Sequence, residues 1–140
     1  LKPWLQDILT LMRPKWEEMQ IAASIDWPEA ELSTRMDPKL MAQVMINLIQ
    51  NACQAMQEQA DGQLILRIFL SEKGLVMEVS DNGPGISEAQ QEEIFVPFFT
   101  TKAQGSGIGL SLSQQIVQAH RGRLSVRSKV GEGATFSILL

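Results

Sequence analysis

Two glycine-rich stretches carry the residue types best suited to chemistry. The first runs from Asp81 to Ile86 with the sequence Asp-Asn-Gly-Pro-Gly-Ile, and the second runs from Gly105 to Leu110 with the sequence Gly-Ser-Gly-Ile-Gly-Leu. Glycine tolerates positive φ angles and lets a ligand approach the main chain closely. Two such stretches in one small chain indicate a pocket lined by backbone.

Asn47 and Asn51 lie one helical turn apart on a predicted helix. Asparagine inside a helix is less favourable than alanine by about half a kcal/mol. One interpretation is a solvated helix face. The other is a pair of amide oxygens that reach a hard cation such as Mg²⁺, which prefers oxygen ligands and takes few protein groups besides water and phosphates.

Asp81 also has two interpretations. A carboxylate directly before Asn-Gly-Pro-Gly can start a turn, or it can accept a hydrogen bond from the amino group of a nucleotide base. The second glycine stretch leads into a predicted helix, whose free N–H groups favour an anion. It is not a Walker loop, because no Gly-Lys-Ser/Thr follows. Upstream, Thr100, Thr101 and Lys102 could reach phosphate oxygens.

The elements that must position these residues follow from the hydrophobic pattern. Helical spacing covers Trp4 to Met19, with a kink or break expected near Arg13 because Pro14 falls inside it. Asp37-Pro38 is a strong helix start, and that helix should end near Glu58.

The other predicted elements are strands at Ile21–Trp27 and Leu32–Met36 around a turn, strands at Gln63–Ser71 and Leu75–Ser80, a short helix at Ser87–Ile94, a loop at Phe95–Lys102, a helix at Ile108–Ala119, and a hairpin of Leu124–Ser128 with Ala134–Leu140. We expect an α+β fold, with a mixed or antiparallel sheet and helices on one face.

Composition limits the class of protein. The chain has 140 residues, 44% of them hydrophobic and 20% charged, as is typical of one soluble globular domain. Its net charge of −4 argues against nucleic acid as a partner, but loop amides and a metal can still hold a nucleotide.

Cys53 is the only cysteine and is expected in the core, which fits a reducing, cytoplasmic setting. Because the chain begins at Leu1 inside a helical pattern, we expect a fragment of a longer protein.

Four segments in order resemble the N, G1, F and G2 boxes of sensor histidine kinases, and the closest likeness is to the nitrogen-regulatory type. They are Asn47–Ala52, Asp81–Ile86, Phe95–Lys102 and Gly105–Leu110. The tail, with Gly131-x-Gly133 before Thr135 and Phe136, resembles the last glycine motif of that family. The resemblance covers about Trp4 to Leu140 as a single domain. It implies the Bergerat fold of gyrase and Hsp90, a two-layer α/β sandwich of about five strands with about three helices on one face.

The resemblance also implies roles for individual residues at an ATP and Mg²⁺ site. Asn51 would be the Mg²⁺ ligand, with Asn47 supporting it near the phosphates. Asp81 would recognise the adenine amino group, with Thr135 assisting through water. A lid from Phe95 to Ser106 would bring Lys102 to the phosphates. Its phenylalanines Phe95, Phe98 and Phe99 would dock the lid or the neighbouring domain rather than stay exposed. The other expected ATP-binding residues are Ala55, Gly83, Gly85, Ile86, Thr100, Thr101, Gly105, Ser106, Gly107, Ile108, Gly109 and Leu110.

Asn47 distinguishes ATP hydrolysis from phosphoryl transfer as the expected activity. Related ATPases carry Glu at this position as the base that activates water, and an amide cannot take a proton. Transfer to a protein acceptor is therefore favoured, with catalysis by Asn47, Asn51 and Lys102. The alternatives are an ATPase of the gyrase, Hsp90 or mismatch-repair kind and a non-catalytic nucleotide-binding module.

The resemblance implies partners outside these residues. The acceptor histidine would lie on a separate dimerisation domain of a homodimeric parent, and a response regulator would act downstream. His120 is followed by Arg121, whereas the family's acceptor is followed by an acidic residue. We therefore expect His120 to end a helix. This fragment should touch neither nucleic acid nor membrane, although the parent could be membrane-anchored.

Overall fold

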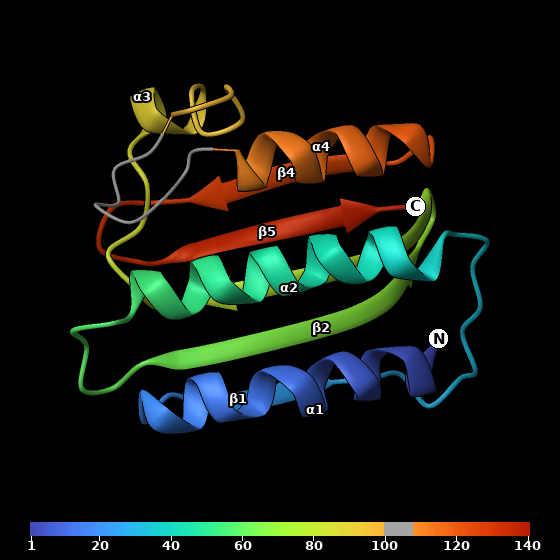
Figure 1. Ribbon diagram of the computed structural model, residues 1–140, viewed down its shortest axis with the longest axis horizontal. Helices are drawn as coiled ribbons and strands as arrows, with labels where there is room; N and C mark the ends of the chain where they lie inside the picture. The colour runs from blue at the N-terminus through green and yellow to red at the C-terminus, as the bar shows by residue number, and fades with distance from the viewer. Residues whose placement is uncertain (100–107) are drawn as a thin grey trace.

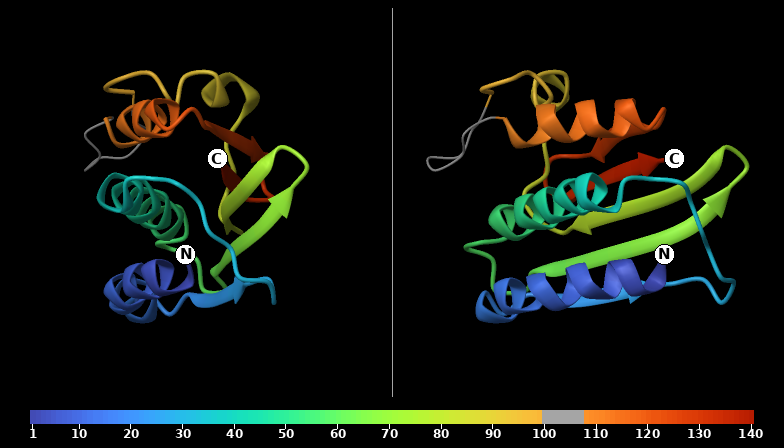
Figure 2. Two further views of the ribbon diagram at one scale, coloured as in Figure 1. Left: turned by 90° about the vertical axis from the view of Figure 1, so that its right-hand side faces the viewer. Right: turned by 45° about the vertical axis from the view of Figure 1, so that its right-hand side comes forward.

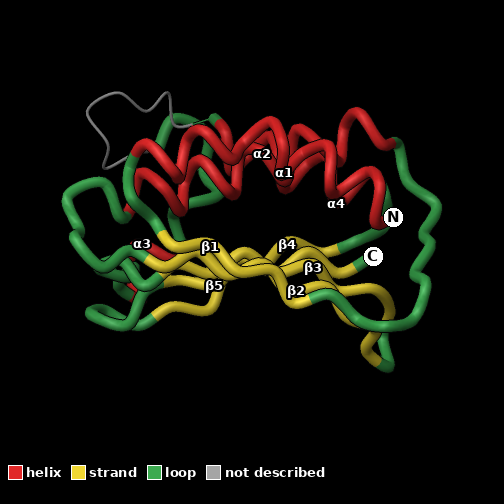
Figure 3. The backbone as a smooth tube through the Cα atoms, turned by 90° about the horizontal axis from the view of Figure 1, so that it is seen from below, coloured by secondary structure: helices red, strands yellow, loops and turns green. Residues whose placement is uncertain are grey.

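The computed structural model describes residues 1–99 and 108–140. In this part of the chain, a five-stranded sheet has three long helices packed on one of its faces (Figure 3). The helices are α1 (Lys2–Glu18), α2 (Pro38–Ala55), α3 (Glu88–Gln91) and α4 (Gly109–Ala119). The strands are β1 (Ala22–Asp26), β2 (Gln63–Ser71), β3 (Gly74–Asp81), β4 (Arg123–Ser128) and β5 (Ala134–Leu139) (Figure 1).

The sheet is mixed and mostly antiparallel, which confirms the expected fold class. Its strand order is β1-β2-β3-β5-β4, and only the β1–β2 pair is parallel. Of the helices on the covered face, α2 lies between α1 and α4 (Figure 2). The helix that carries both asparagines therefore runs across the middle of the sheet.

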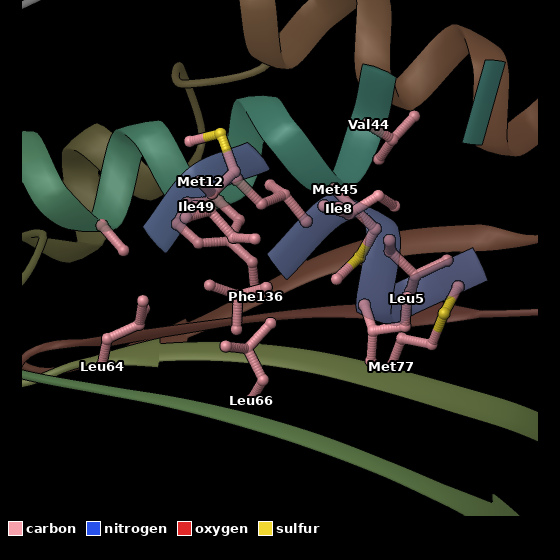
Figure 4. Packing of buried hydrophobic residues seen from close by; sticks show 14 of the residues in the cluster. Leu5, Ile8, Met12, Val44, Met45, Ile49, Leu64, Leu66, Met77 and Phe136 are labelled. Carbon is pink, nitrogen blue, oxygen red and sulfur yellow. The ribbon is translucent and has the colours of Figure 1, made fainter. Parts of the chain in front are cut away.

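The core fills the space between the helices and the sheet. Figure 4 shows Leu5 and Ile8 of α1, Met45 of α2, and Leu66 and Met77 of the sheet packed together, and all of them are buried. Burial of each such side chain contributes about 1.5–3 kcal/mol relative to exposure. The predicted core face of α2 is confirmed, because each of its members is buried: Met41, Val44, Met45, Leu48, Ala52 and Met56.

Helix α1 continues through Pro14, so of the two predicted outcomes near Arg13, a kink or a break, the break is wrong. Proline removes one backbone hydrogen bond, the one to the carbonyl four residues earlier, at Thr10. Both Pro14 and Thr10 lie on the exposed side of α1, where water can bond the carbonyl. Five buried side chains on the opposite side hold the helix together: Leu5, Ile8, Leu9, Met12 and Trp16.

The segment Leu32–Met36 is not a strand, which corrects the predicted hairpin with Ile21–Trp27. β1 pairs instead with β2, in parallel. The chain after Trp27 leaves the sheet and leads to the start of α2 (Figure 1). Leu32 and Met36 still pack against the core from this connection, which explains their apolar pattern.

One boundary and one helix face also differ from expectation. α2 ends at Ala55 rather than near Glu58. In α4, Ile116 and Val117 are buried as predicted, but Leu112 is 40% exposed. Ser111 and Ser113 are buried in its place. Within the described residues, no helix has the length and apolar character that crossing a bilayer requires.

Candidate functional site

Helix α2 forms one wall of the candidate site. Asp37 caps its first turn, with its Oδ1 accepting hydrogen bonds from the backbone N–H groups of Lys39 at 2.9 Å and Leu40 at 3.0 Å. Asn47, Asn51 and Ala55 then follow at intervals of four residues, so they lie along one side of the helix over about 12 Å of its axis. All three are half-buried.

The Ala55 end of this wall meets the first glycine stretch. A side chain on Gly83 would come within 3.1 Å of the Ala55 carbonyl oxygen, so the two backbones are in close contact. Asp81 is the last residue of β3. It lies on the same face of the strand as Met77 and Val79, which are buried in the core. Its Oδ1 accepts a hydrogen bond from the Gly83 N–H at 2.8 Å. The turn interpretation of Asp81 is confirmed, and its carboxylate lies beside the end of α2.

The Asn47 end of the wall meets the start of α4. Asn47 Nδ2 donates to Ser113 Oγ at 3.1 Å. A Cβ on Gly109 would come within 2.5 Å of Asn47 Oδ1, so a side chain there would force the Asn47 carboxamide out of its present position. The structure therefore brings parts of both glycine stretches against one helix, with Asn51 between them.

Asn82 is a structural residue of the site that the sequence interpretation missed. Its Oδ1 accepts from the Gln63 N–H at 2.7 Å and from Gln59 Nε2 at 3.0 Å, and its Nδ2 donates to the Asp61 carbonyl at 2.9 Å. These bonds tie the connection after α2 to the end of β3. The signal was the asparagine at a strand end, which had been assigned only to the turn.

Gly85 and Ile86 lie against the turn between β4 and β5. Gly85 has a φ of 77°, and a side chain there would clash with the Lys129 carbonyl oxygen. The Ile86 N–H donates to Ser128 Oγ at 2.8 Å. The clash accounts for the glycine by packing within the chain, and the Ile86 side chain packs against the core.

Thr135 lies on the opposite face of the sheet from Asp81, which corrects its expected role beside the adenine. Side chains alternate along a strand, and Thr135 is paired with Ser80 while Ala134 is paired with Asp81. The Thr135 and Ser80 hydroxyls are 2.8 Å apart. Ala134, rather than Thr135, is the β5 residue beside Asp81.

The segment before the second glycine stretch is described only as far as Phe99. Phe95 and Phe99 pack against the core, whereas Phe98 is 78% exposed. Phe95 and Phe99 thus dock within this chain, and the expectation that Phe98 docks against a neighbouring domain stays a prediction. The predicted site residues Thr100, Thr101, Lys102, Gly105, Ser106 and Gly107 lie outside the described residues. Ile108 is exposed, and Leu110 packs against the core.

His120 is the C-cap of α4, as the sequence predicted. Its Nδ1 lies 2.7 Å from the Ile116 carbonyl oxygen, and its Nε2 accepts a hydrogen bond from the Asp37 N–H at 3.0 Å. This pattern requires the neutral tautomer with the proton on Nδ1. The Nε2 bond joins the end of α4 to the start of α2, and the Nδ1 contact is made within α4.

The donor groups at the site fit a Mg²⁺ ion that is held mainly by phosphate. Among residues 1–99 and 108–140, no group of three or more histidine, cysteine, aspartate or glutamate side chains could hold a metal. Asn51 offers one amide oxygen on the wall between the two glycine stretches. Mg²⁺ commonly takes one or two protein oxygens, several waters and substrate phosphates, and such a set is compatible with this wall.

Cys53 lies on the core side of α2 and is fully buried. Burial raises the pKa of its thiol above the ordinary value, nearby Lys15 lowers it, and the Asp81 carboxylate raises it further. The thiol is thus a neutral packing group close to the first glycine stretch.

In a comparison with protein families, residues 36–140 match the family described as histidine kinase-, DNA gyrase B- and HSP90-like ATPase. The chain belongs to this family. It is 34% identical over 160 residues to the signal transduction histidine-protein kinase AtoS of Escherichia coli strain K12, covering 97% of this chain and 26% of AtoS. It is 35% identical over 140 residues to the C4-dicarboxylate transport sensor protein DctB of Rhizobium meliloti strain 1021, covering all of this chain and 22% of DctB. It therefore spans about a quarter of the length of these curated relatives.

Solved structures of the histidine kinase ThkA have the same fold. The nucleotide-free catalytic domain of ThkA superposes with a TM-score of 0.88 at 30% identity, over 99% of this chain and 90% of that one. ThkA in complex with the response regulator protein TrrA superposes with a TM-score of 0.83 at 27% identity, over 99% of this chain and 39% of that one. The predicted Bergerat-type fold and the family are confirmed.

Proposed function

We propose that this chain is the catalytic domain of a histidine kinase, which binds Mg-ATP and transfers its γ-phosphoryl group to a histidine on a separate domain of the parent protein. The chain belongs to a family of ATPase-like domains, and AtoS and ThkA are named as histidine kinases. The parent is proposed to form a homodimer and to pass the phosphoryl group to a response regulator, and the complex of ThkA with the response regulator protein TrrA supports the second of these points.

Asn47 is the residue that favours phosphotransfer over hydrolysis. Its carboxamide lies where the start of α4 meets α2, in contact with Gly109 and Ser113. A carboxamide cannot accept a proton from water, so this position lacks a general base. An ATP molecule held here would be protected from rapid hydrolysis and available to an incoming histidine.

Each end of the α2 wall would hold a different end of the nucleotide. At the Ala55 end, the Asp81 carboxylate would accept a hydrogen bond from the adenine amino group. At the Asn47 end, the N–H groups in the first turn of α4, which have no partner within the helix, favour the negative charge of phosphates. Ile108, the N-cap of α4, makes no side-chain capping bond to these groups. Lys102 and the 105–107 segment are proposed to complete the phosphate site.

Asn51, between these two ends, is the residue proposed to hold Mg²⁺ with its amide oxygen. When bound, the ion would neutralise phosphate charge in a reaction that depends on positioning and electrostatics. Asn51 would hold the ion, and with it the neutralised phosphate charge, at a defined position relative to Asn47.

The test combines binding, hydrolysis and transfer. Calorimetry with Mg-ADP should detect binding to the 140-residue chain. With γ-labelled ATP, the chain alone should release phosphate slowly and remain unlabelled, whereas addition of the parent's histidine-containing domain should give an acid-labile phosphoprotein.

Each of the other possible results of these experiments would reject a defined part of the proposal. Absence of binding at millimolar nucleotide would reject the nucleotide site. Rapid phosphate release with no labelled acceptor would favour the ATPase alternative, and binding with neither reaction would favour a non-catalytic module. A label on His120 would reject the separate acceptor.

A further inference from the structure

Ser113 places a buried hydroxyl against the side chain of Asn47. The Ser113 residue is 2% exposed, and its Oγ accepts the Asn47 Nδ2–H bond at 3.1 Å across 66 positions of sequence. Ser111, two residues earlier, is also buried at 7% exposure, but its Oγ donates to the Ile108 carbonyl within α4. Of these two serines, Ser113 is therefore the one that connects α4 to the asparagine.

A carboxamide has two chemically different ends, and rotation by half a turn exchanges a hydrogen-bond acceptor for two donors. With Nδ2 held by Ser113, the Asn47 Oδ1 lies against Gly109 at the start of α4. The first turn of a helix has unsatisfied N–H groups and a partial positive charge, which favours an oxygen there. The helix start thus selects the orientation with the oxygen toward α4. The Ser113 hydroxyl, which accepts from Nδ2 in that orientation, holds the carboxamide there.

Other packing keeps the two helices at this separation. Gly109 leaves no room for a side chain between α4 and Asn47, and His120 joins the other end of α4 to the start of α2. The Ser113 hydroxyl has little freedom to move away, since α4 is bonded to the start of α2 at its His120 end and lies directly against Asn47 at Gly109. The Asn47 orientation is thereby built into the packing of two helices.

We propose that Ser113 is a positioning residue, which holds the Asn47 carboxamide with its oxygen toward the start of α4. This inference rests on the proposed function, in which Asn47 lies beside the reacting phosphates. A preset orientation matters most for the chemical step, because small displacements of a positioned group can slow a reaction up to a hundredfold. Nucleotide binding, which is shared among many contacts, is less sensitive.

The experiment compares Ser113→Ala with Ser111→Ala in the parent protein. Ser113→Ala should lower the kcat of histidine phosphorylation about tenfold and change the KM for Mg-ATP less than about threefold, whereas Ser111→Ala should change neither by more than about twofold. Ser113→Thr, which restores a hydroxyl, should recover most of the lost kcat. Equal effects of the two alanine substitutions would overturn the inference.

A double-mutant cycle separates positioning from general structural damage. In an Asn47→Ala background, Ser113→Ala should have no further effect on kcat, because the group that it positions is gone. An unchanged tenfold effect in that background would contradict the inference.

NMR of the nucleotide-free chain gives a readout that does not depend on catalysis. The side-chain amide order parameter of Asn47 should fall in Ser113→Ala and stay unchanged in Ser111→Ala. An unchanged order parameter in Ser113→Ala would reject the positioning role even if the wild type is inactive. Loss of order with no phosphotransfer by wild type would instead reject the proposed function and leave the orientation supported.

Discussion

At the residue scale, the candidate site depends on neutral amides and one carboxylate placed along α2 and at the end of β3. Asn47 and Asn51 face the region between the glycine stretches, and Asp81 lies at the Ala55 end. Their chemical differences allow separate tests of the phosphate end and the base end of the proposed nucleotide.

Asn51→Ala should reduce phosphotransfer by about a hundredfold or more, because the proposed Mg²⁺ ligand is removed from a reaction driven by electrostatic stabilisation. The fold should persist, since the side chain is only half-buried. Labelling with γ-labelled ATP measures the loss, and circular dichroism checks the fold. Gln54→Ala, on the exposed side of the same helix, is the control and should retain activity. Full activity of Asn51→Ala would exclude the metal role.

Asp81→Asn should weaken Mg-ADP binding about tenfold or more, because hydrogen bonds to charged groups contribute about 1.5–3 kcal/mol. The asparagine can still accept the Gly83 N–H bond through Oδ1, so the turn should be kept. Calorimetry measures the affinity, and Asp61→Asn, at an exposed residue of the connection after α2, provides a matched loss of charge. Equal affinities for the two variants would refute base recognition by Asp81.

At the element scale, the position of α4 against α2 is set from both ends. Ser113 contacts Asn47 near the start of α4, and His120 contacts Asp37 at its end. Because Asp37 also caps α2, one residue serves two helices. Trp4 Nε1 donates to the Pro38 carbonyl at 2.9 Å, which brings α1 to the same junction.

His120→Ala should lower the free energy of unfolding by about 1 kcal/mol, since the Asp37 N–H loses its acceptor. Urea denaturation measures the change. Gln118→Ala, an exposed substitution on the same helix, should have an effect within about 0.5 kcal/mol. If both variants unfold at the same urea concentration, the His120–Asp37 bond contributes nothing to stability.

The elements with local signals could be predicted from the sequence. The Asp37-Pro38 helix start and the β2–β3 and β4–β5 hairpins all have such signals, and each is present. Leu32–Met36 could not be assigned, because apolar alternation does not distinguish a strand from a connection packed on the core. Thr135 was misplaced because a shift of one residue reverses the sheet face, and the register was not available from the sequence. The Ser113–Asn47 bond spans two helices and has no local signature.

At the scale of the whole molecule, the stability should depend on pH through the buried thiol of Cys53. Its pKa in the folded chain is raised above an ordinary value of 9.0 by burial first. The favourable contribution of the neutral thiol is therefore complete below about pH 9 and is lost as the pH rises through the folded-state pKa.

Thermal unfolding between about pH 8.5 and 10.5 should show this loss. The wild type should lose more stability over that range than Cys53→Ala, although the variant should be less stable at neutral pH by about 1 kcal/mol or more because of its cavity. Parallel stability curves for the two proteins would show that the thiol does not titrate differently in the folded state.

The parallel pairing of β1 with β2 has a consequence for the order in which the molecule opens. Ala22 pairs with Gln63, 41 positions away, whereas β2–β3 and β4–β5 are joined by short turns. β1 is also an edge strand whose residues are all exposed. Closing long loops delays pairing during folding, and edges with little burial open first. In amide hydrogen exchange, β1 should therefore exchange well before the central strand β3, and equal protection of the two strands would show that the sheet opens as one unit.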